Sequence, residues 1–134
     1  AEVVHSDYRF PTYVGDMPHT WVGAEYLLAV RVLFLYERGD ELILGAGVDP
    51  EWLEGGRKVS IADFPSHFGS VSYEMTKADG MVSIHVSGEA VPEGGFVFKS
   101  PLAVPPREVK VNGVVMDGAA ARFSRLPAEV VFAY

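Results

Sequence analysis

Residues 21–36 read WVGAEYLLAVRVLFLY, an apolar run interrupted by Gly23, Glu25 and Arg31. A helix that is apolar on nearly every side has to be covered on nearly every side. The run is also shorter than the about 20 mostly apolar residues that a membrane span needs. It therefore predicts one long buried α-helix. Its covering is expected to come from a larger protein, of which this chain is the C-terminal part, or from a partner chain.

The sequence after Glu41 changes to the period of two that is typical of β-strands. Residues 82–87 alternate apolar and polar side chains after the turn Asp79-Gly80, which is a strong hairpin signal. Further strands are predicted at 41–47, 58–61, 71–76, 95–99, 108–111, 114–116, 121–123 and 129–134. Short strands at this spacing predict a mainly β fold, an antiparallel β-sandwich of about seven or eight strands preceded by the helix.

The predicted division of the chain falls at Gly39, because Arg38 followed by glycine is a plausible helix end. Residues 1–39 then form an irregular N-terminal segment and the apolar helix, and residues 40–134 form the sandwich. Asp16 or Thr20 is expected to cap the start of the helix.

The composition excludes several classes of function. A net charge of −7, from 18 acidic and 11 basic residues, disfavours binding to nucleic acid or to an anionic membrane surface. The absence of cysteine removes disulfides, thiolate zinc sites and cysteine nucleophiles. No HExxH, P-loop, GxGxxG or GxSxG motif occurs, so neither a metal nor a cofactor is predicted.

The start of the helix, GDMPHTWVGAEY at 15–26, brings polar and aromatic residues together. Trp21 and Glu25 are four residues apart and share one helix side, and Asp16 and His19 lie just before them. An indole offers an apolar face to a sugar ring, while carboxylate and imidazole groups bond its hydroxyls. These four residues are the predicted carbohydrate-binding residues. The alternative is structural: Trp21 in a core, Glu25 paired with an arginine across an interface, and Asp16 as a helix cap.

Two other residues have a structural and a functional interpretation. His85 falls on the polar side of its strand and is expected to be exposed. Trp52, in the turn GVDPEWL at 47–53, is expected to anchor that turn at the top of the sandwich, with a sugar platform as the alternative.

Glycoside hydrolysis usually needs two positioned carboxyl groups. Asp16 and Glu25 are the pair near the predicted pocket, and nothing in the sequence predicts that they are enclosed. No catalytic residue is therefore assigned, and the chain alone is not expected to be catalytic.

Several motifs in this order resemble the C-terminal end of bacterial (α/α)6-barrel glycoside hydrolases and phosphorylases, the six-hairpin glycosidases that include α-L-rhamnosidase-like enzymes. They are GDMPHTWVGAEY, GVDPEWL, HFGSVSYE and VKVNG. The resemblance implies that the last barrel helix runs into a C-terminal β-sandwich. It also implies that Asp16, His19 and Trp21, with Glu25 as a further candidate, face the substrate pocket, while the main acid and base lie earlier in the barrel.

The sequence thus supports a first hypothesis, the C-terminal portion of a carbohydrate-active hydrolase. The alternative is a noncatalytic carbohydrate-binding or interaction domain whose helix is covered by a partner or by self-association. An independent small enzyme is the third hypothesis. In the first two cases an uncovered apolar helix should make the free chain oligomeric.

Overall fold

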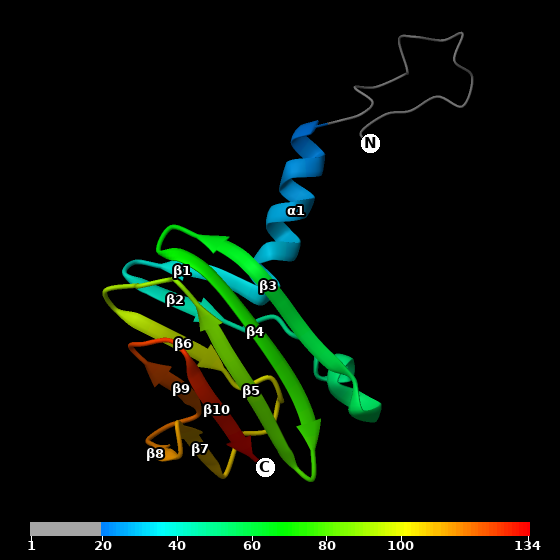
Figure 1. The fold of residues 1–134 in the computed structure, drawn as a ribbon. Coiled ribbons are helices and arrows are strands. Elements are labelled where there is room, and N and C mark those ends of the chain that lie inside the picture. Colours follow the sequence, from blue (N-terminus) through cyan, green and yellow to red (C-terminus); the bar gives the residue numbers. More distant parts are fainter. Residues whose placement is uncertain (1–19) are drawn as a thin grey trace, which may run out of the picture. The chain divides into compact units, whose positions relative to one another are not determined.

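The computed structural model describes residues 20–134, in which ten strands follow one α-helix (Figure 1). The chain divides after Arg31 into two compact units. The described part of the first unit, residues 20–31, is entirely helical. The second unit, Val32–Tyr134, contains the end of that helix and all ten strands.

Helix α1 spans Thr20–Phe34, and none of its residues is buried. The helix forms as predicted, but residues 20–134 do not cover it, so its covering by a larger protein or by a partner stays a prediction. The predicted end of the helix at Gly39 is wrong. The apolar run changes from helix to strand at Leu35, which is fully buried and begins β1, Leu35–Arg38. Gly39, at φ +62°, instead makes the turn between β1 and β2.

The smaller sheet has four strands in the order β1-β2-β6-β9. Its other members are β2 (Glu41–Leu44), β6 (Gly95–Lys99) and β9 (Ala120–Phe123). Strands β2 and β6 are parallel, with Leu42 opposite Phe96. The prediction of a wholly antiparallel sandwich is therefore wrong for this pair of strands. The long connection between them passes through the second sheet.

The larger sheet has six strands in the order β3-β4-β5-β10-β7-β8, all paired antiparallel. They are β3 (Lys58–Ser66), β4 (Gly69–Ala78), β5 (Met81–Gly88), β7 (Glu108–Val111), β8 (Val114–Met116) and β10 (Ala128–Ala133). The β4–β5 hairpin turns at Asp79-Gly80, as predicted. A β-bulge between Ile61 and Phe64 shifts the register of β3 against β4.

The core lies between the two sheets, and alternate residues of each strand enter it. Strand β5 shows the pattern clearly: Val82, Ile84 and Val86 are buried, while the residues between them face solvent. Across the core, the Tyr73 ring meets the Phe98 ring edge-on at 5.1 Å. No polar or charged residue of the described chain is buried, so apolar burial is the main source of stability in this sandwich.

The structure has ten strands, whereas the sequence predicted a sandwich of about seven or eight strands from nine candidate segments. Each of these nine segments contains a strand of the structure. The tenth strand is β1, which lies at the end of the apolar run, where no strand was predicted. The mainly β fold with one preceding helix is confirmed, and its two sheets form the layers of Figure 1.

Candidate functional site

Two of the four predicted carbohydrate-binding residues lie in the described part of the chain. Trp21 and Glu25 are both on α1 and both exposed, and Trp21 has 67% of its surface accessible. Their spacing of four puts them on one side of the helix. Asp16 and His19 lie outside the described residues. In the described chain Trp21 is not a core residue, and its side chain is accessible to a ligand or to another protein surface.

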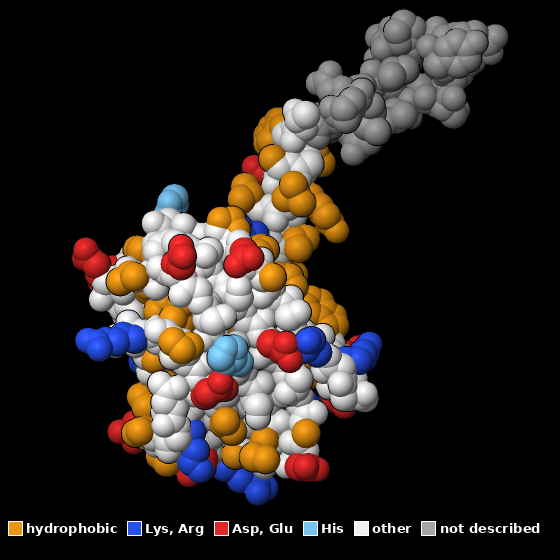
Figure 2. All heavy atoms as spheres, viewed as in Figure 1, with side chains coloured by type: hydrophobic (Ala, Val, Ile, Leu, Met, Phe, Trp, Pro, Cys, Tyr) orange, Lys and Arg blue, Asp and Glu red, His pale blue; other side chains and the backbone are white. Residues whose placement is uncertain are grey.

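Apolar side chains are exposed all round α1. With about 100° between successive residues, Tyr26 lies roughly 140° and Leu27 roughly 240° around the axis from Trp21. Tyr26 is 69% exposed, Leu27 68% and Leu28 53%. Figure 2 shows the apolar side chains that face the viewer along this helix. Because a surface helix ordinarily has one apolar stripe and one polar face, α1 has the composition of a helix that is surrounded.

The last turn of α1 is closely bonded to the sandwich. The N–H of Gly47 donates to the Leu33 carbonyl and that of Gly45 to the Phe34 carbonyl, both at 2.9 Å. The Tyr73 hydroxyl also donates to the Phe34 carbonyl, at 3.3 Å. These donors satisfy carbonyl groups that a helix end leaves without intrahelical partners. Burial raises the pKa of Tyr73.

Trp52 lies beside the same turn of α1. It is part of η2, a 3₁₀ segment at Pro50–Gly56, and its ring stacks on Phe34 with centroids 6.0 Å apart and 26° between the planes. Trp52 remains 38% exposed, whereas its neighbour Leu53 is buried. Leu53 therefore anchors the turn in the core, and Trp52 covers the end of α1 rather than the top of the sandwich.

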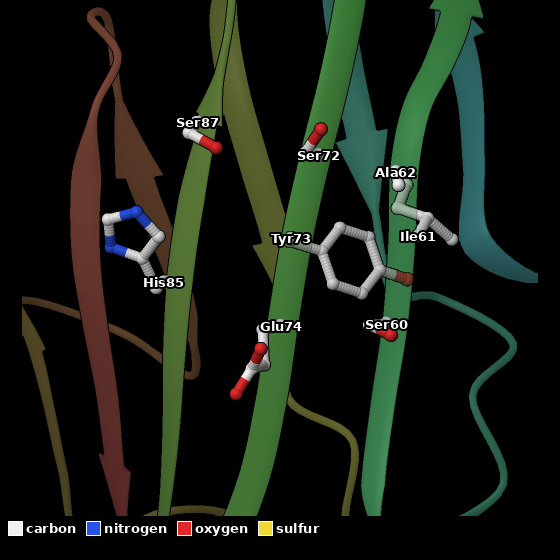
Figure 3. A pocket seen from close by; sticks show the side chains of 8 residues that line it. All are labelled: Ser60, Ile61, Ala62, Ser72, Tyr73, Glu74, His85 and Ser87. Atoms are coloured by element: carbon white, nitrogen blue, oxygen red, sulfur yellow. The ribbon is translucent and has the colours of Figure 1, made fainter.

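A polar hollow of about 270 Å³ lies on the outer face of the larger sheet (Figure 3). Its polar lining comes from Ser60 on β3, Ser72 and Glu74 on β4, and His85 and Ser87 on β5. Serine side chains are short, so the taller Glu74 and His85 stand at its border. His85 is exposed, as predicted.

Three polar residues beside this hollow form one row across neighbouring strands: Glu74, His85 and Glu129. Glu74 is opposite His85, and His85 is opposite Glu129. His85 Nδ1 and Glu129 Oε1 are 2.5 Å apart, and Lys58 Nζ lies 2.9 Å from Glu74 Oε2. General acid–base catalysis needs such groups beside a held substrate and away from bulk water. This row is open to solvent, so it has the residue types but not the enclosure of an active site.

A second charged group joins strands of the smaller sheet. Glu41 on β2 accepts hydrogen bonds from Arg38 on β1 and Arg122 on β9, the shortest at 2.6 and 2.7 Å respectively. These bonds lower the pKa of Glu41, and its carboxylate raises the pKa of Arg38. The group holds three strands together and has a structural role.

Among residues 20–134, no group of three or more histidine, aspartate or glutamate side chains is placed to hold a metal ion. In the same part of the chain, no helix has the length and hydropathy of a membrane span.

The sequence analysis missed the contacts at the end of α1. The spacing of Gly45 and Gly47 was a usable signal, since glycines often mark a close approach of two backbones. A Cβ on Gly47 would lie 2.8 Å from the Leu33 Cα.

Comparison with known proteins adds no family to these observations. No protein-family model matches the chain, and no curated protein or solved structure matches it significantly.

Proposed function

We propose that this chain is the C-terminal portion of a carbohydrate-active glycoside hydrolase. In this proposal the β-sandwich supports a helical barrel, α1 is the last helix of that barrel, and the start of α1 contributes substrate contacts. The observation that carries the proposal is the exposure of apolar side chains on every side of α1.

The distribution of these side chains favours a helical body over a simple dimer. One neighbouring helix covers one stripe of α1, of the order of 100° wide. Trp21, Tyr26 and Leu27 point in three different directions around the axis. Covering all three takes neighbours on several sides, which a barrel or bundle of helices supplies and a single two-helix contact does not.

Carbohydrate is the proposed substrate class because of the residues at the start of the helix. Trp21 and Glu25 lie on one side of α1 and combine an apolar ring with a carboxylate acceptor. The motifs around them also resemble the six-hairpin glycosidases. Asp16 and His19 complete the proposed site, and the main acid and base are proposed to lie on the barrel itself.

The alternative is a noncatalytic carbohydrate-binding domain, and it has less support. Such a domain needs its own exposed aromatic platform. In residues 32–134 the aromatic side chain with substantial exposure is Trp52, and Phe34 already covers one face of its ring. The polar hollow near His85 has no exposed aromatic ring in its lining.

The test is Trp21→Ala in the full gene product that contains these residues. Saccharide binding is measured by titration calorimetry against a panel of oligosaccharides, and stability by thermal unfolding. We expect at least about a tenfold loss of affinity, equivalent to about 1.4 kcal/mol, with a small change in melting temperature. Val91→Ala, at an exposed position of the sandwich, is the matched control and should change neither property. A large loss of stability with unchanged binding would make Trp21 a packing residue and overturn the proposed site.

A further inference from the structure

The polar hollow on the outer face of the larger sheet lies wholly within the second unit of the chain. Two pairs of opposed residues frame it, Ser72 with Ser87 and Glu74 with His85. Opposed side chains of an antiparallel pair have Cβ atoms about 5 Å apart, and successive outward residues follow at about 7 Å along a strand. Figure 3 shows these four side chains, here called the frame, around the space between β4 and β5. The frame therefore has the dimensions of a site for one small ring.

The two titratable members of the frame have partners outside it. Lys58 Nζ lies 2.9 Å from Glu74 Oε2, and His85 Nδ1 lies 2.5 Å from Glu129 Oε1. Each carboxylate beside the hollow thus has a donor of its own, and the lining offers a charged ligand no unpaired opposite charge. The two contacts also orient the Glu74 and His85 side chains, so less rotamer freedom remains to be lost when a ligand binds.

The frame presents both donors and acceptors of hydrogen bonds. Ser72 Oγ accepts from the Asp63 N–H at 2.9 Å, which leaves the Ser72 O–H to donate to a ligand. A carboxylate only accepts, so the hydrogen between His85 and Glu129 lies on Nδ1, and Nε2 of the neutral ring is left as an acceptor. The Ser87 hydroxyl can act in both ways. A ligand that fits this frame has groups that donate and accept as well.

We propose that this hollow binds one ring of a neutral saccharide through hydrogen bonds to the frame. Sugar hydroxyls donate and accept, and a neutral ligand leaves the pairs of Glu74 and His85 with their partners intact. No exposed aromatic ring lines the hollow, so the sugar has nothing to stack on, and each new hydrogen bond replaces one to water. Binding is therefore weak, with a dissociation constant of the order of 1 mM.

The role of this site rests on the proposed function. A carbohydrate-binding domain that acts alone needs tighter binding than hydrogen bonds on an open face supply. In a carbohydrate-active enzyme, a weak site still contributes when the substrate is a polymer, because linked rings are present at a high local concentration. The hollow is then an auxiliary contact for polysaccharide on the sandwich and takes no part in hydrolysis.

Titration of the isotope-labelled 134-residue chain, followed by NMR, tests the site at single residues. The probes are the methyl glycosides of glucose, galactose and rhamnose, with glucuronate and glucosamine as charged counterparts. At least one neutral probe should shift the amide signals of the frame and saturate in the millimolar range, and the charged sugars should bind more weakly. If no neutral probe gives a saturable shift at the frame, or if a charged sugar binds more tightly, the proposal is overturned.

Two serines of β5 provide a matched pair of variants. Ser87 and Ser83 are both on the outer side of this strand, but only Ser87 lines the hollow. Valine removes the hydroxyl and suits a strand, so both variants should keep the fold. Ser87→Val should weaken binding about fivefold, the usual net contribution of one hydrogen bond, and Ser83→Val should not change it. Equal effects of the two substitutions would place the sugar outside the hollow and overturn the proposal.

The outcome is separable from that of the proposed function. Trp21→Ala should leave the titration of the hollow unchanged, because every residue of the frame belongs to the sandwich. If no probe binds the hollow, this inference fails and the proposed function stands, since that function rests on the exposed apolar side chains of α1.

Discussion

At the scale of single residues, Gly47 lies where the end of α1 leaves no room for a side chain. The Leu33 backbone packs so closely that a Cβ on Gly47 would lie 2.7 Å from Leu33 Cδ2 and 2.8 Å from Leu33 Cα. Gly47→Ala should therefore destabilise the sandwich by about 1–3 kcal/mol, the usual cost of overpacking. Urea unfolding of the isolated chain measures this.

Gly23→Ala is the matched control for that substitution. Gly23 also belongs to the apolar run and lies within α1, where an added Cβ would meet nothing within 4 Å. Because alanine is the better helix former by about 1 kcal/mol, this variant should not lose stability. If the two variants unfold alike, the close approach at Gly47 has no energetic importance.

Tyr73 gives a prediction about pH. Its O–H donates to the Phe34 carbonyl, and burial raises its pKa above the usual value of about 10. A group whose pKa is raised by folding contributes stability below its unfolded pKa and loses that contribution as pH rises through its folded pKa. The wild-type chain should therefore lose stability above about pH 10.

Tyr73→Phe should lose about 1 kcal/mol at pH 7, the net value of a typical hydrogen bond. Gly45 still donates to the same carbonyl, so the loss should not exceed this. Above pH 10 the stability of the variant should fall less steeply than that of the wild type, since one raised pKa is gone. Urea midpoints at pH 7 and pH 10.5 provide the comparison, and parallel losses in the two proteins would contradict it.

The sequence predicted individual residues unevenly. The exposure of His85 followed directly from strand alternation. Trp52 was predicted to anchor the turn at 47–53, but Leu53 is the residue that enters the core. The sequence indicates a compact turn there without showing which side chain is buried. The contacts of Gly45, Gly47 and Tyr73 join distant parts of the chain, and local pattern has no information about such pairs.

At the scale of elements, α1 and β1 could not be separated by hydrophobic pattern. A continuous apolar run has no period, so it does not distinguish a surrounded helix from a buried strand. The boundary is set by tertiary contacts: Leu35 pairs with Leu44, and the carbonyls just before it bond to the loop after β2.

Two leucines in α1 test which part of the helix the sandwich stabilises. Leu33 is half-buried at the last turn, and Leu28 is exposed. In the isolated chain Leu33→Ala should cost about 2 kcal/mol, the low end for a buried leucine. Leu28→Ala should stay within about 0.5 kcal/mol, a typical surface effect.

The full gene product should reverse the result for Leu28. If a helical body surrounds α1, Leu28→Ala removes packed methylene groups there and should cost about 2–5 kcal/mol. Chemical unfolding of both variants in both proteins measures the difference. A surface-like effect of Leu28→Ala in the full gene product would contradict the covering of α1.

At the scale of the whole molecule, the two-layer β architecture followed from alternation and turn residues, but the arrangement of strands did not. The turn Asp79-Gly80 fixes a local hairpin, and this hairpin was predicted. The parallel pairing of β2 with β6 brings together strands about fifty residues apart and depends on how both sheets share the core. Such non-local pairings are determined by packing rather than by neighbouring residues.

The isolated chain should not hydrolyse glycosides. Among the described residues, Glu74 and Glu129 are engaged with Lys58 and His85 on an open sheet face, and Glu25 is exposed on α1. Hydrolysis usually needs two carboxyl groups on either side of an enclosed bond. Aryl glycosides incubated with the purified chain should release product at the rate of buffer. Turnover that disappears in Glu25→Gln would contradict this expectation.

Self-association is the final expectation for the isolated chain, and it follows from α1 alone. Apolar side chains are exposed on every side of this helix, and exposed apolar surface favours association between proteins. Sedimentation velocity should therefore show a concentration-dependent oligomer. Leu27→Lys places a charge in that surface and should shift the protein toward monomer, whereas Val114→Lys, at an exposed residue of β8, should not. If the chain stays monomeric at high concentration, the exposed apolar side chains of α1 do not drive association. The argument that another body surrounds this helix would then fail.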